Sequence, residues 1–143
     1  MAEPPDAVET APLDLAIRAL RFRDRTAAEL EARLEQRGVG EAEREQALET
    51  LERIGYVDDE RFARSRAERL AERGSGDALI RHDLERRGVA AEIVEAVLAG
   101  IEPEGVRAAR IAARRGPGGK TARYLAARGF GEDALEWIVA QED

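Results

Sequence analysis

One six-residue pattern occurs three times in this 143-residue chain and constrains its fold more than any other feature. In each copy a leucine is followed three residues later by arginine, then by glycine, then by valine or phenylalanine; the copies are Leu34–Val39, Leu84–Val89 and Leu125–Phe130. A glycine directly after a helix lets the backbone enter the left-handed region, and the next residue then packs against the last turn. The leucine and the residue after the glycine, which would pack against each other, are apolar in every copy. Each copy therefore predicts a helix that ends in a tight glycine turn before a second helix begins.

A third helix precedes each of these helix pairs. Apolar residues at helical spacing predict leading helices over about 13–23, 59–73 and 104–115. The pattern therefore predicts an all-α fold, elongated and curved, built from three tandem three-helix modules. The expected order is a disordered arm over 1–12, followed by modules over 13–57, 58–102 and 103–143 with freedom to bend at Asp58 and Pro103.

Local signals support these boundaries. Thr26 and Glu29 form a capping box at the start of the second helix. Asp58 is a natural N-cap, and Val57 and Phe62 on either side of it are spaced as a hydrophobic staple. Nine residues after each glycine turn stands an apolar residue that we expect to pack in the core: Leu48, Leu98 and Val139.

The composition excludes most kinds of catalytic and metal site. The chain has no cysteine and a single histidine, His82, so thiolate zinc sites, cysteine nucleophiles and sites with two imidazoles are ruled out. The run Gly118–Thr121 resembles the end of a phosphate-binding loop, but Arg114 stands where its first glycine belongs and no strand is predicted before it. We therefore predict a non-enzymatic protein with no catalytic residues, no cofactor and no metal.

Targeting signals are missing from the sequence as well. No apolar run approaches the roughly 18 residues that cross a bilayer, and the first residues do not resemble a secretory signal. We expect a cytoplasmic monomer that does not contact membranes.

The distribution of charge points to a partner. The formal net charge is −7, which by itself argues against a nucleic-acid binder. Residues 106–131 nevertheless contain no acidic residue and form a basic patch, which consists of Arg107, Arg110, Arg114, Arg115, Lys120, Arg123 and Arg128. This patch is either a solvated helix face or a surface that binds phosphates or an acidic protein, for which arginine has a bidentate geometry.

One segment at the start of the second module resembles the signature of the RecX family of recombination regulators. The residues of this family motif are Gly55, Tyr56, Asp58, Asp59, Glu60, Arg61, Phe62, Ala63 and Arg64. The three glycine turns in the same order, and the residues from Arg23 to Thr26, resemble the same family, so that the similarity covers about 13–140. The third module is shorter than the family pattern, and Gly40 and Gly131 stand where a stronger helix cap would be expected.

The resemblance implies a regulator of the bacterial recombinase RecA. Proteins similar to this one bind the RecA filament on single-stranded DNA and inhibit its ATPase, strand-exchange and co-protease activities, which modulates recombination, DNA repair and the SOS response. Single-stranded DNA would then be contacted through the filament, with weak direct binding in addition.

Two alternatives remain open at this stage. The first is a helix-turn-helix protein that binds DNA directly, since two helices joined by a glycine turn are compatible with that motif. The helices that follow the first and third turns begin with acidic residues, which disfavours them as recognition helices. The second alternative is a structural scaffold with no link to DNA.

Overall fold

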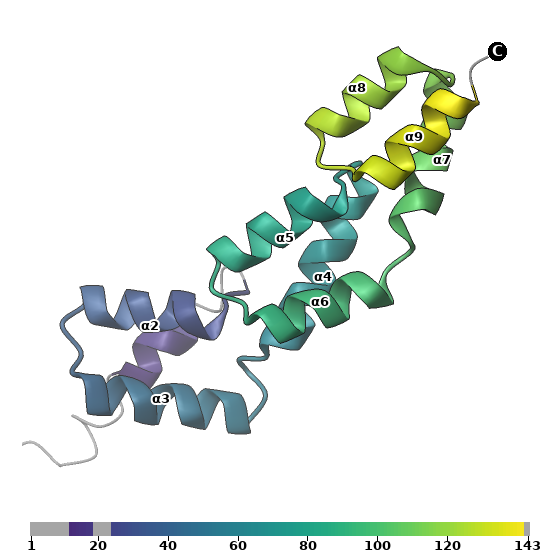
Figure 1. Cartoon of the computed structure of the whole chain (residues 1–143). Coiled ribbons are helices and arrows are strands. Elements are labelled where there is room, and N and C mark those ends of the chain that lie inside the picture. The colour runs from purple at the N-terminus through teal and green to yellow at the C-terminus, as the bar shows by residue number, and fades with distance from the viewer. Residues whose placement is uncertain (1–11, 19–23, 142–143) are drawn as a thin grey trace, which may run out of the picture. The chain divides into compact units, whose positions relative to one another are not determined.

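The computed structural model describes residues 12–18 and 24–141, and every regular element in these ranges is an α-helix (Figure 1). Residues 12–18 are helical and are followed by α2 (Ala27–Gln36), α3 (Glu41–Arg53), α4 (Asp59–Glu72), α5 (Asp77–Arg86), α6 (Ala91–Gly100), α7 (Glu104–Arg115), α8 (Gly119–Ala127) and α9 (Glu132–Ala140). The predicted all-α fold is confirmed. Apart from Pro12, the predicted arm lies outside the described residues, as does the end of the predicted helix over 13–23.

The chain divides into two compact units within α4, one ending at Phe62 and the other beginning at Ala63. The core of the first unit contains residues of the leading helix, α2 and α3, among them Ala16, Leu30 and Leu51. In the second unit, α7, α8 and α9 pack around a core of their own (Figure 1), whose buried residues are Ala108, Ala112, Leu125, Phe130, Ala134 and Ile138. The helices α4 to α6 share this second unit from Ala63 onward.

The three predicted glycine turns are present with the expected hydrogen bonds. The residue beyond each glycine donates its N–H to the carbonyl of the leucine five residues earlier, from Val39 to Leu34 at 3.0 Å, from Val89 to Leu84 at 3.1 Å and from Phe130 to Leu125 at 3.1 Å. Each of these leucines is fully buried. The turn therefore closes one helix and at the same time directs an apolar side chain into the core.

Of the three apolar residues expected in the core, Leu48, Leu98 and Val139, the prediction for Val139 is wrong. Leu98 is buried and Leu48 packs against the core of the first unit, but the side chain of Val139 is 46% exposed. On α9 the core positions belong instead to Ala134 and Ile138, which are four residues apart and share one helix face.

None of the helices in the described ranges has the length and apolar character needed to cross a membrane.

Candidate partner interface

The family motif holds three helix ends together in the first unit. The Asp58 side chain caps α4, because its Oδ1 accepts the N–H of Arg61 at 3.1 Å. The Oδ1 atom of Asp59 accepts the N–H of Ala27, the first residue of α2, at 2.9 Å. Arg61 donates from its guanidinium to the carbonyls of Gly55, at 3.0 Å, and Tyr56, at 3.4 Å, beyond the end of α3.

The remaining motif residues divide into buried and exposed groups. Phe62 and Ala63 are buried, as is Val57 within the same segment. Tyr56, whose side chain is 52% exposed, Glu60 and Arg64 face solvent. Most of the motif therefore has a structural role, which the sequence spacing indicated for Asp58 and Phe62 but not for the contacts of Asp59 and Arg61.

Arg107, the first residue of the predicted basic patch, lies inside the second unit. Its side chain is 5% exposed and donates hydrogen bonds to the Ser75 carbonyl at 2.7 Å and the Glu102 carbonyl at 2.9 Å, and it pairs with the Asp77 carboxylate. A buried guanidinium with three acceptors joins α7 to the loop between α4 and α5. It is not available to a partner.

Arg128, the last residue of the patch, also forms hydrogen bonds within the second unit. Its guanidinium donates to the carbonyls of Gly74, at 2.9 Å, and Arg73, at 2.7 Å. Its own carbonyl accepts the N–H of Gly76 at 2.7 Å, and the carbonyl of Gly129 accepts the N–H of Ala78 at 3.1 Å. The two carbonyls that directly follow α8 thus accept N–H groups at the start of α5, which have no partner within their own helix.

Glu104 completes this junction between α5, α7 and α9. Its carboxylate accepts the N–H of Asp77 and the N–H of Gly131, each at 2.7 Å. It therefore supplies the cap that Gly76 and Gly131, which lack side chains, cannot provide for α5 and α9. These bonds span both sides of Pro103, where the sequence predicted freedom to bend, so independent movement of α7–α9 would require breaking them.

Burial and neighbouring charges shift the pKa values of two aspartates in the second unit, Asp77 and Asp83. Burial raises the pKa of Asp77, and the neighbouring Glu104 charge adds to this, while Arg107 acts in the opposite direction. Burial also raises the pKa of Asp83, but hydrogen bonds and charge from Arg66 and Arg87 outweigh it, so the pKa of Asp83 lies below its ordinary value. The Asp83 carboxylate binds Arg66 through both oxygens, at 3.0 and 3.1 Å.

Five residues of the predicted patch are exposed, and four of them form what we call the basic surface: Arg114, Arg115, Lys120 and Arg123, at the end of α7 and the start of α8. The guanidinium of Arg115 lies over the Tyr124 ring, 3.6 Å from its centroid. Arg110 is exposed too, but it is paired with Glu102 through two bonds of 2.6 Å. None of the four residues of the basic surface forms an ion pair with a carboxylate in the described ranges.

The turn before α8 is a helix start and not a nucleotide loop. Gly118 is the N-cap of α8, and the Thr121 hydroxyl donates to the Gly116 carbonyl at 2.6 Å. No acidic residue occupies the first turn of α8, so the positive end of the helix adds to the charge of Lys120. His82 is exposed, and the described residues contain no cluster of side chains that could hold a metal ion.

Comparison with known proteins identifies relatives along nearly the whole chain. Residues 13–51 match the first three-helix domain of RecX, and residues 58–98 match the second. The regulatory protein RecX of Thermus thermophilus is 39% identical, over 92% of this chain and 93% of that protein. The regulatory protein RecX of Chromohalobacter salexigens is 37% identical, over 92% of this chain and 93% of that protein.

A solved structure supports the fold. The crystal structure of RecX from Lactobacillus salivarius superposes with a TM-score of 0.78 and 20% sequence identity, covering 93% of this chain and 95% of that one. The helical fold, the glycine turns and the two matched domains agree with one another. The chain therefore belongs to the RecX family of regulatory proteins.

Proposed function

We propose that this chain binds the RecA recombinase filament assembled on single-stranded DNA and inhibits its ATPase, strand-exchange and co-protease activities. The proposal rests on membership of a family of regulatory proteins. The structural observation that carries it is the basic surface, whose four cations are exposed at the end of α7 and the start of α8 without carboxylate partners in the described ranges. Such a surface suits a filament that presents phosphates along its length.

The chemistry of the basic surface favours phosphate contacts. Arginine binds a phosphate through two parallel N–H groups, and Arg114, Arg115 and Arg123 all present exposed guanidinium groups. Tyr124 beneath Arg115 keeps one of these groups in place by a cation–π contact. A single-stranded backbone within the filament could then cross the end of α7 and the start of α8.

The structure gives less support to direct, sequence-specific recognition of DNA. In a helix-turn-helix protein the N-terminal end of the second helix meets the bases. Here α3 begins with Glu41 and Glu43, and α9 begins with Glu132 and Asp133. Both helix starts would repel phosphates, so we assign any direct DNA binding to the basic surface and not to these helices.

The test measures binding to a fluorescein-labelled single strand by anisotropy, first bare and then coated with recombinase. We expect the chain to bind the coated strand more tightly than the bare one. The double variant R114E/R123E should weaken filament binding at least about tenfold, since each reversal removes a charge-assisted contact of about 1 kcal/mol or more.

A matched control separates the basic surface from overall charge. Arg69 and Arg86 are exposed on α4 and α5 and form no ion pair in the described ranges. The variant R69E/R86E carries the same charge change, and we expect its affinity to stay within about twofold. Equal losses in both variants would remove the basic surface from the proposal, and absence of filament binding by the unaltered chain would remove the proposal itself.

A further inference from the structure

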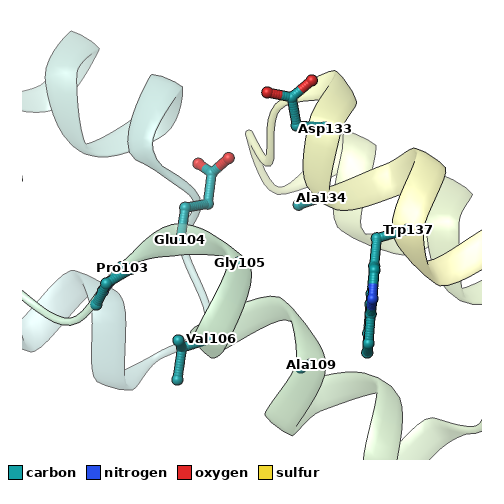
Figure 2. A pocket seen from close by; sticks show the side chains of 8 residues that line it. All are labelled: Pro103, Glu104, Gly105, Val106, Ala109, Asp133, Ala134 and Trp137. Atoms are coloured by element: carbon teal, nitrogen blue, oxygen red, sulfur yellow. The ribbon is translucent and has the colours of Figure 1, made fainter.

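A second surface of the α7–α9 helices is apolar and acidic, and it lies apart from the basic surface. It is a pocket of about 560 Å³ between the start of α7 and the part of α9 that ends at Trp137. Val106 and Ala109 line it from α7, and Ala134 and Trp137 line it from α9. Figure 2 shows Val106 on the α7 wall and the Trp137 indole on the α9 wall in the lower part of the view, with the carboxylates of Glu104 and Asp133 at the top.

The apolar part of this pocket is incompletely covered. Val106 is 48% exposed and Trp137 is 49% exposed, although Ala134, which also lines the pocket, is buried. Exposed apolar groups that gather in one hollow mark interaction sites more often than scattered ones do. Tryptophan in particular supplies much of the binding energy where a partner side chain covers its ring.

The charge around the pocket selects the partner. Two carboxylates and no basic residue line it, and Glu132 adds an exposed charge at the start of the same helix. Two backbone N–H groups bind Glu104, whereas Asp133 has no hydrogen bond or ion pair in the described part of the chain. The negative rim favours a ligand that carries a cation next to an apolar group.

The chain itself does not supply a suitable occupant near its N-terminus. Residues 1–11 contain three acidic residues, Glu3, Asp6 and Glu9, and no basic residue. A segment of that charge would be repelled by Asp133 and its neighbours. The negative rim instead suits a positively charged segment, which a partner protein can supply.

We propose that this pocket binds a partner-protein segment in which an apolar side chain is flanked by lysine or arginine. The apolar side chain packs between Val106 and the Trp137 indole, and the flanking cation pairs with Asp133. This site goes beyond the proposed function, because it is separate from the basic surface and its ligand is a peptide segment and not a phosphate.

Selection from random peptides tests the proposal on the whole chain. Twelve-residue random peptides displayed on phage are selected on the unaltered protein, with the Val106→Ser protein as counter-selection. We expect enriched peptides to contain an apolar residue with basic neighbours. Trp137 is the only tryptophan, so a synthetic copy of an enriched peptide without tryptophan should shift the protein's emission to the blue and reduce quenching by acrylamide.

Matched variants decide whether the peptide occupies this pocket. Val106→Ser should weaken binding about tenfold and Asp133→Asn about threefold. Val139→Ser and Glu136→Gln change exposed residues of α9 that do not line the pocket, and we expect both to leave the affinity unchanged.

Several results would overturn the proposal. The selection could fail to enrich any peptide over the counter-selection, or it could enrich acidic or neutral peptides. The control variants could also lose as much affinity for the peptide as Val106→Ser and Asp133→Asn do. A blue shift of the protein alone that grows with its concentration would also overturn it, because the pocket would then bind a second copy of the chain. None of these results bears on filament binding, which is measured separately.

Discussion

Gly76 and Gly129 show how closely two backbones approach in the second unit. The backbone of Gly76 has φ −81°, which any residue adopts, yet a Cβ there would overlap the Gly129 carbonyl group. Gly129 lies equally close to α5, because a Cβ there would lie 2.7 Å from the Leu79 nitrogen. Glycine is required at Gly76 by contact and not by conformation.

Replacing Gly76 by alanine should therefore destabilise the protein by at least about 2 kcal/mol, since the backbone it would strike cannot move aside cheaply. Gly105→Ala is the matched control, because nothing lies within 4 Å of a Cβ there and Gly105 lies in α7. We expect that control to be neutral or to stabilise by up to about 1 kcal/mol. Unfolding in urea measures both, and equal midpoints would contradict the close approach.

Asp83 makes stability depend on pH in a defined direction. Its pKa is lower in the folded chain than in the unfolded chain, so the folded state binds the proton less tightly. The stabilisation is present above the unfolded value of about 3.9 and is lost as the pH falls through the folded pKa. We expect Tm to fall more steeply between about pH 5 and pH 3 in the unaltered chain than in Asp83→Asn. Parallel Tm curves would show that the ion pair contributes nothing.

At the scale of helices, the junction between α5, α7 and α9 depends on one buried cation. Removing the Arg107 guanidinium leaves the Ser75 carbonyl and the Asp77 carboxylate without their donor. We expect Arg107→Met to destabilise the protein by about 3 kcal/mol, as when one partner of a buried pair is removed.

Arg110→Met is the comparison for this prediction, because Arg110 lies on the same helix in an exposed pair with Glu102. We expect its unfolding midpoint to equal that of the unaltered chain within experimental error. A similar loss in both variants would mean that the burial of Arg107 has no special role.

The glycine turns were predictable and the junction was not, for a physical reason. Each turn is set by residues within one short segment, such as Leu84 and Val89, whose order is visible in the sequence. The junction joins residues far apart in the sequence: Arg128 and its acceptor Gly74 differ by 54 in residue number, and Glu104 and Asp77 differ by 27. No periodic pattern marks such pairs in a single sequence.

For the same reason, the sequence predicted the candidate site only in part. The run of seven basic residues was visible as composition, but only the fold separates Arg107 and Arg128, which bind carbonyls inside the unit, from the exposed Arg114 and Arg123. The pocket beside Trp137 gave no signal, because aromatic residues at helical spacing are more often part of a core.

At the scale of the whole molecule, the second unit should open as one body. Its α5 and α8 share backbone hydrogen bonds through Gly76 and Ala78, and Arg107 and Glu104 add side-chain bonds. We therefore expect the most protected amides of α5 and α8 to exchange with the same opening free energy in native-state hydrogen exchange. In Arg107→Met the two values should separate, and distinct values in the unaltered chain would support modules that open independently at Pro103.

The steady-state ATPase rate of RecA on single-stranded DNA, measured as this chain is added, tests the central claim most directly. We predict that micromolar protein lowers the rate strongly, that R114E/R123E is at least about tenfold less potent, and that R69E/R86E inhibits like the unaltered chain. An ATPase rate that does not change with added protein, while the chain remains folded, would contradict the account.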